Sequence, residues 1–255
     1  MKRAFAFAGR CLRELLRDPL SYLFCFAFPL VMLGMMTAID SVIPPEAGMT
    51  IFKIRNLTPG IAVFALSFVM LLATLSVSKD RSSAFLLRLC SSPMRPAEFV
   101  AGYILPLLLV SAGEAVVTYL AGGVIGGVMG ERLLIGNALL SILSLIPCAV
   151  LFIALGVLFG ALLGEKAAPP CCSILISLCG VLGGIWFDSS VFPEGNFFGV
   201  LCRILPFENA VEVARAALAG QAIPGGALLN CTLWALGAFC LSSLVFRLRL
   251  RADLC

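Results

Sequence analysis

Long apolar segments alternate with short polar ones along this chain. Six segments are long enough to cross a bilayer as helices, because a membrane-spanning helix needs about 20 mostly apolar residues. The predicted spans are residues 20–39, 57–77, 99–123, 136–163, 168–187 and 226–246. Membrane barrels alternate apolar and polar residues instead. The pattern therefore predicts an all-α polytopic membrane protein with six transmembrane helices.

Residues 1–18 precede the first span and show a helical pattern with two faces. The apolar positions are Phe5, Ala8, Leu12, Leu15 and Leu16. Arg10, Arg13 and Arg17 lie on the other face, and Asp18-Pro19 ends the pattern because the residue before proline avoids the α region. We expect an amphipathic helix in the inner membrane interface, with its arginines near anionic headgroups. A soluble helix or a simple basic anchor are the alternatives.

The polar segment 79–97, between the second and third spans, predicts a short cytoplasmic helix. Asp80 can cap a helix that runs from about Arg81 to Cys90. Its apolar face consists of Phe85, Leu86 and Leu89, flanked by Arg81 and Arg88. A helix this short is marginal alone, and its exposed apolar side chains favour docking onto another protein. Alternatively, these side chains dip into the bilayer.

Residues 191–220 are too charged to span a bilayer and too apolar for an ordinary loop. Positions 197–202 form an apolar half-span, and Pro206 breaks the chain before Phe207. Glu208, Glu212 and Arg215 then share one helix face. We expect two short helices that re-enter the outer leaflet, with their backbone groups covered by protein or by a water-lined cavity.

Glu114 is an ionisable residue well inside a predicted span. A charge at this depth is costly and usually faces protein or water. Glu114 is therefore a candidate for the translocation path. A structural hydrogen bond between helices is an equally good interpretation.

Composition agrees with a membrane protein, since 61% of the residues are hydrophobic and 13% are charged. This excludes both a soluble globular domain and a disordered chain. If both termini are cytoplasmic, 13 of the 18 basic residues fall on the cytoplasmic side, as the positive-inside rule requires. The net charge of +4 is thus explained by topology, and no nucleic acid partner is expected.

Catalytic and ligand-binding motifs are missing from the sequence. Histidine is absent, and the 11 cysteines are scattered, so no metal site is expected. The sequence contains no G-x-x-x-x-G-K-[ST] phosphate loop. We expect neither an enzyme nor a bound cofactor. Gly156 and Gly160 instead have the spacing of a close helix contact.

The ordered set of elements resembles the permease subunits of ABC transporters of the ABC-2 (type V exporter) family. The most specific match is residues 79–87 (KDRSSAFLL), followed by Pro93 and Gly102. It is similar to the family's coupling helix, with Ser82 and Ala84 at the usual Gly and Glu and Tyr103 at the usual Lys. A second match is residues 205–215 (LPFENAVEVAR), which look like the family's outer re-entrant helix.

This resemblance implies a partnership, because such permeases work with ATPases. It implies two ATP-hydrolysing subunits, which hold ATP and Mg²⁺, and a second permease chain in a homodimer or a heterodimer. It implies export from the cytoplasm or inner leaflet across the cell (plasma or inner) membrane. The apolar spans suit a drug, lipid or peptide substrate. The rival interpretations are a secondary transporter or channel without an ATPase, and a membrane-embedded enzyme.

Overall fold

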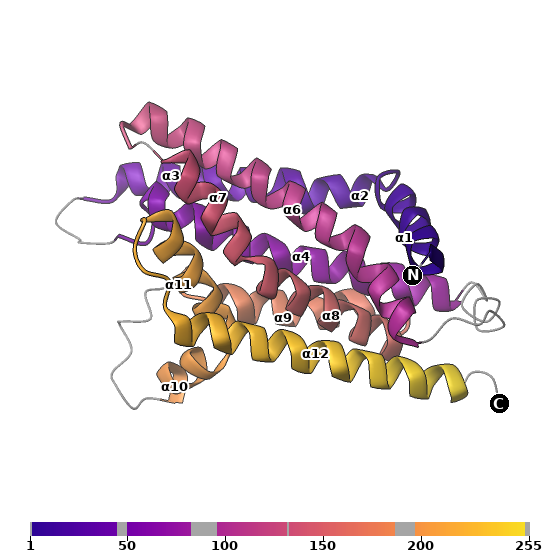
Figure 1. Ribbon diagram of the computed structural model, residues 1–255. Coiled ribbons are helices and arrows are strands. Elements are labelled where there is room, and N and C mark those ends of the chain that lie inside the picture. Colours follow the sequence, from indigo (N-terminus) through magenta and orange to yellow (C-terminus); the bar gives the residue numbers. More distant parts are fainter. Residues whose placement is uncertain (1, 45–49, 83–95, 132, 187–196, 253–255) are drawn as a thin grey trace.

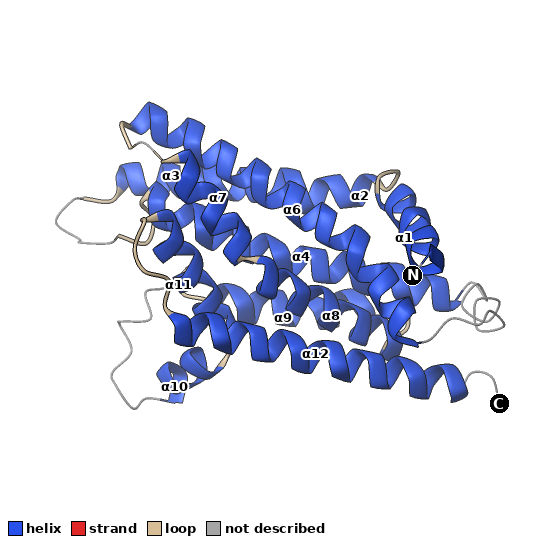
Figure 2. Ribbon diagram, viewed as in Figure 1, coloured by secondary structure: helices blue, strands red, loops and turns tan. Residues whose placement is uncertain are grey.

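A computed structural model describes residues 2–44, 50–82, 96–131, 133–186 and 197–252. Every regular element in these ranges is a helix (Figure 2). The all-α polytopic class is thereby confirmed. Five helices are long and apolar enough to cross a membrane: Leu23–Val42, Ile54–Ser82, Val100–Met129, Ile135–Leu162 and Gly225–Leu248.

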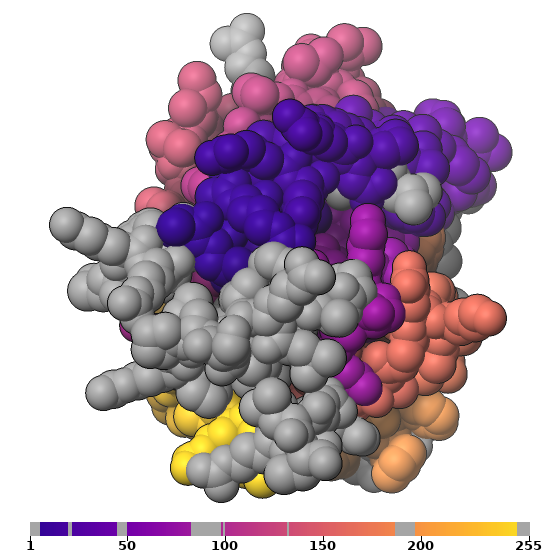
Figure 3. Space-filling model, turned by 90° about the vertical axis from the view of Figure 1, so that its right-hand side faces the viewer, coloured from indigo at the N-terminus to yellow at the C-terminus, as the bar shows by residue number. Residues whose placement is uncertain are grey.

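The chain begins with a helix that lies across one end of the bundle. This is α1 (Lys2–Leu15), and it turns at Arg17-Asp18 into the first span. The first span consists of α2 (Pro19–Tyr22), a π-helical turn η1 (Leu23–Ala27) and α3 (Phe28–Val42). Figure 3 looks onto this end of the molecule and shows α1 crossing its upper part.

The second span, α4 (Ile54–Ser82), is the central helix. Its most apolar window is 89% buried, whereas the corresponding window of α12 (Gly225–Ala252) is 22% buried. α6 (Pro96–Met129) and α8 (Ile146–Leu162) pack directly against α4. Because α4 has protein on nearly every face, its polar groups must find partners inside the bundle.

The fourth and fifth predicted spans are not single long helices. The fourth is divided at Leu145 into α7 (Ile135–Ser144) and α8, and Pro147 begins the second part as prolines often do. The fifth predicted span contains α9 (Ala168–Leu182), of 15 residues. At about 1.5 Å per residue it is shorter than a bilayer core of about 30 Å. The count of six spans therefore stays a prediction.

The segment before the last span contains two short helices, α10 (Phe197–Ile204) and α11 (Pro206–Leu218). They meet at Leu205, immediately before the predicted break at Pro206. These two helices lie at one end of the bundle, whereas α1 and the end of α12 lie at the other (Figure 1). For the described residues, the expected helix pair is present.

The two glycines expected to mark a close helix contact do so between α8 and α4. A Cβ added at Gly156 would lie 2.4 Å from the Met70 carbonyl oxygen, and one at Gly160 would lie 2.6 Å from Val77 Cβ. The Thr74 hydroxyl also donates to the Gly156 carbonyl over 3.1 Å. Small residues therefore let the two backbones approach, as in other membrane helix pairs.

Candidate functional site

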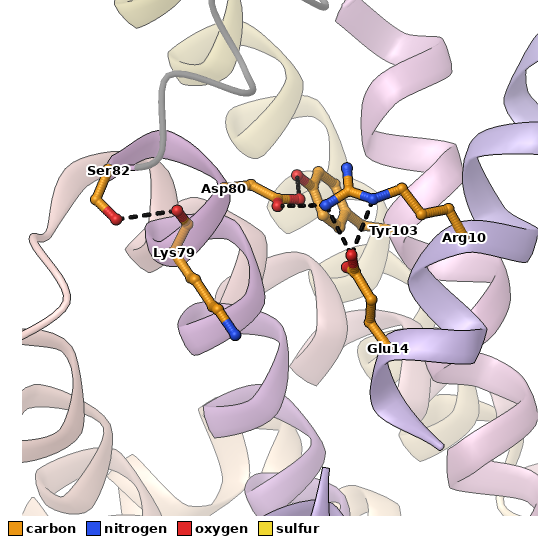
Figure 4. Close-up of polar contacts among 6 residues, drawn as sticks. All are labelled: Arg10, Glu14, Lys79, Asp80, Ser82 and Tyr103. Carbon is orange, nitrogen blue, oxygen red and sulfur yellow. Dashed lines mark hydrogen bonds and ion pairs between the residues drawn. The ribbon is translucent and has the colours of Figure 1, made fainter. Parts of the chain in front are cut away.

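A polar cluster joins three helices at the end of the bundle where α1 lies. Asp80 is in the last turns of α4, and its side chain meets Arg10 of α1 and Tyr103 of α6 (Figure 4). Arg10 Nη2 donates to Asp80 Oδ1 over 3.1 Å, and the Tyr103 hydroxyl donates to Oδ2 over 2.7 Å. Asp80 is 6% exposed and Tyr103 1%. We call Arg10, Asp80 and Tyr103 the basal cluster.

Glu14 adds a second carboxylate one helical turn along α1. Arg10 Nε donates to Glu14 Oε1 over 2.9 Å, so the guanidinium lies between two acidic groups. Partial burial alone would lower the pKa of Arg10, but the charges of Asp80 and Glu14 outweigh it and raise that pKa. Arg10 therefore stays charged, and it holds α1 to the base of α4.

Apolar contacts fix the position of the basal cluster. The Phe7 ring packs edge-on against Tyr103, with centroids 4.9 Å apart. Gly102 is required there, since an added Cβ would lie 2.4 Å from Phe7 Cδ1. Cys11 is buried in the same contact, and burial, with the nearby Asp80 charge, raises the pKa of its thiol to about 12. The thiol is thus uncharged and packs as a small apolar group.

Arg81 extends the connection to a fourth helix. Its Nη1 donates to the carbonyl of Ala161, near the end of α8. A charged donor at this place suits the carbonyls that end a helix, where the dipole is negative. Two adjacent residues of α4 therefore connect it to three other helices at this end of the bundle. Asp80 contacts α1 and α6 through Arg10 and Tyr103, and Arg81 contacts α8.

The expected role of Asp80 as a helix cap is wrong. α4 continues without a break through Asp80 to Ser82, so Asp80 lies inside a helix and its carboxylate bonds to other helices. The remaining coupling residues lie outside the described residues: Phe85, Leu86, Arg88 and Leu89.

Only part of the apolar face predicted for residues 1–18 is buried in the structure. Ala8 and Leu15 are buried, whereas Leu16 is 52% exposed. Arg13 and Arg17 are exposed as expected. Arg10 does not point to the surface with them, because Asp80 holds it against the bundle.

The sequence analysis did not predict that Tyr103 bonds to Asp80. In the sequence, Tyr103 stands out only as a departure from the family pattern, at the position of the usual Lys. A usable signal exists, since a tyrosine within an apolar span needs a partner for its hydroxyl.

Glu114 is completely buried in α6. Thr118, one turn later, donates its hydroxyl to Glu114 Oε1 over 3.0 Å. Among the described residues, Oε2 has no hydrogen-bond partner. The bond to Thr118 lies within α6, and a role of Glu114 in a translocation path stays a prediction.

A polar cavity of about 630 Å³ lies at the opposite end of the bundle, beside the predicted outer residues. Glu208, Glu212 and Arg215 line it. Arg215 also bonds to the carbonyls of Asn56 and Gly184 over 3.0 and 3.1 Å. Pro206 begins α11, and Phe207 stacks on Phe152 with centroids 5.8 Å apart. This end thus combines an apolar anchor with a charged surface.

Comparison with known proteins identifies the class. The sequence model of the ABC-2 type transporter family matches residues 3–219, which include the basal cluster and both outer helices. The chain belongs to this family, and it is a membrane-embedded transporter permease component. A search among curated proteins found no match.

Proposed function

We propose that the chain is the permease subunit of an ATP-driven exporter. The observation that carries this proposal is the family match over residues 3–219. The basal cluster supports it, because a movement imposed on the end of α4 would be passed to α1 and α6 through buried polar contacts. The segment that follows α4 is the one proposed to dock on the ATPase.

The assembly we propose contains two permease chains and two ATPase subunits. The ATPase subunits hold ATP and Mg²⁺ and supply the energy, whereas this chain binds and orients the substrate. The second permease chain is a copy of this one or a related chain. An amphipathic or lipid-like substrate, such as a drug, lipid or peptide, suits a permease whose spans are this apolar.

Co-purification from native membranes tests the proposal. The tagged chain, extracted in mild detergent, is expected to bring down a protein with a phosphate-binding loop and vanadate-sensitive ATP hydrolysis. If no ATPase accompanies the unmodified chain, a secondary transporter or channel is the better interpretation.

The docking segment has its own test. The double change Phe85→Asp and Leu89→Asp should leave the chain inserted but lose the ATPase, because it replaces apolar docking groups with charges. Arg88→Ala should have a much smaller effect, as expected for a charge at an exposed rim. Unchanged ATPase binding by the double variant would exclude this segment as the coupling helix.

The proposed location is the plasma or inner membrane, with both termini cytoplasmic. A membrane-impermeant thiol reagent should label a cysteine placed at Glu46 or Glu194 from outside intact cells. One placed at Lys166 should react only after lysis. Labelling of the Lys166 position in intact cells would contradict this topology.

A further inference from the structure

An apolar cavity of about 500 Å³ lies on the side of the bundle, far from the polar cavity beside α11. α6 and the α7–α8 junction form its walls, and Leu66 of α4 forms part of its floor. The residues of α1 that line it are Ala8, Gly9 and Leu12. The cavity therefore extends from the α1 end of the molecule into the span region.

The shape of the helices explains why this space is not filled by protein. The chain breaks between α7 and α8 at Leu145, so α7 packs on α11 whereas α8 packs on α4 and α12. The facing part of α6 carries small side chains at Ser111, Ala112 and Ala115. A break opposite small residues leaves a groove that these helices cannot close.

The chemistry of the cavity favours a hydrocarbon chain over water. Its lining is almost entirely aliphatic, and the hydroxyl of Ser111 already donates to the Leu108 carbonyl over 2.9 Å. Water needs two to four polar partners, which this lining does not offer. Leu109 and Leu143, on its walls, are 62% and 60% exposed, so the cavity opens sideways, where the bilayer lies.

The α1 end of the cavity adds a positive charge. Arg13 lies one helical turn after Gly9, so the two share a face of α1. Arg13 is exposed, whereas Arg10 is held by Asp80 and Glu14. Residues 2–18 contain five basic and two acidic side chains. A negatively charged headgroup beside Arg13 would complement this excess.

We propose that this cavity binds one acyl chain of an anionic phospholipid, with the headgroup beside Arg13. Its volume of about 500 Å³ accommodates one acyl chain. Bound there, the lipid contacts α1, α6 and the α7–α8 junction together. It is a resident ligand that holds α1 in place, and it does not occupy the path of the exported substrate.

Photocrosslinking of the purified full-length chain in nanodiscs tests the site. The probe is phosphatidylglycerol with a diazirine on one acyl chain, and the comparison is phosphatidylcholine with the same label. Peptide mapping is expected to place crosslinks on residues 105–115 and 142–149. Labelling spread evenly over all exposed apolar helices would overturn the proposal.

Two matched pairs of variants sharpen the test. Ala112→Trp fills the cavity and should reduce these crosslinks at least fivefold, whereas Val124→Trp, exposed on the same helix, should not. Ala112→Phe replaces the first variant if it fails to fold. Arg13→Gln should reduce the preference for phosphatidylglycerol about fivefold, the worth of one basic residue near a charged headgroup. Arg55→Gln, at the other end of the molecule, should leave it unchanged.

An unchanged preference in Arg13→Gln would overturn the headgroup assignment, and unchanged crosslinks in both Ala112 variants would overturn the site. The proposed placement of α1 at the inner interface decides only which leaflet supplies the lipid. The site itself does not depend on that placement. Nanodiscs expose both leaflets to the same lipid, so the crosslinking outcome does not depend on an ATPase or on topology. Failure here and failure of the proposed function are therefore distinguishable.

Discussion

The two ends of the bundle are held together by different kinds of polar contact. At the α1 end, charged and phenolic side chains of different helices bond to one another, as Arg10 and Tyr103 do with Asp80. At the α11 end, side chains bond mainly to backbone carbonyls. Ser141 of α7 donates to the Ala214 carbonyl over 2.6 Å, and Asn137 donates to that of Leu218 over 3.2 Å.

This difference has a mechanical meaning. A contact between two side chains can adjust when the helices shift, because both side chains can rotate about their own bonds. A bond to a backbone carbonyl fixes a side chain to the helix itself. We therefore expect the α1 end to move during transport and the α11 end to move as one body with α7.

Removing the centre of the basal cluster should have the largest effect. Asp80→Ala leaves the buried Tyr103 hydroxyl without its acceptor and Arg10 without its main counter-charge. We expect a loss of about 3 kcal/mol in the free energy of unfolding. Thermal unfolding in detergent measures it, at roughly 2–4 °C per kcal/mol for a chain of this size.

Asp80→Asn is the matched control, since it keeps an acceptor for Tyr103 but removes the charge. It should cost less than half as much as Asp80→Ala. Equal losses in the two variants would mean that the charge, and not the hydrogen bond to Tyr103, dominates the cluster.

The α11 end should respond next most strongly through Arg215. Arg215→Met keeps much of the side-chain volume but loses both bonds to the carbonyls of Asn56 and Gly184. We expect about 2 kcal/mol of destabilisation, since the site is half-buried. Arg215→Lys should recover only part of this stability, because one ammonium group cannot bond to both carbonyls as the guanidinium does. Full recovery by lysine would show that charge alone matters.

The sequence predicted the helices better than it predicted their partners. Apolar runs and Pro206 locate most helices, because periodicity and proline act within one segment. Arg10 and Asp80 are 70 positions apart, and no local pattern reports such a pair. Asp80 looked like a cap, yet α4 continues through it to Ser82, and the sequence has no proline or glycine between residues 61 and 82 that would end the helix earlier.

Two departures from the predicted spans have local signals in the sequence. Pro147 marks the division between α7 and α8. Gly183-Gly184 ends α9 before the predicted end of the fifth span, with Gly184 at a φ of 62°, a conformation that favours glycine. Tyr119 and Ser141 are a weaker signal of contacts between helices. The hydroxyl of each residue needs a hydrogen-bond partner within the apolar bundle, but the sequence does not show which residue that partner is.

Ser141 supplies a smaller test of the α11 end. Its hydroxyl is completely buried and lies within 2.5 Å of the Tyr119 hydroxyl while donating to Ala214. Ser141→Ala should cost about 1 kcal/mol, the usual worth of a buried hydrogen bond, and it should loosen α11 from α7. Hydrogen exchange of the α11 amides measures the second effect. Ser144→Ala, whose hydroxyl bonds only within α7, is the control and should leave α11 unchanged.

The smallest effect is expected for Glu14, the exposed neighbour of the basal cluster, and it tests whether Arg10 depends mainly on Asp80. Glu14 bonds to Arg10 at the i, i+4 spacing, with its side chain 56% exposed. Such pairs contribute about 0.3–0.5 kcal/mol and are weakened by salt. Glu14→Gln should therefore shift thermal unfolding by about 1–2 °C, and added salt should abolish the difference. A loss comparable to that of Asp80→Ala would mean that Arg10 depends on both carboxylates, and that the basal cluster acts as a single charged unit.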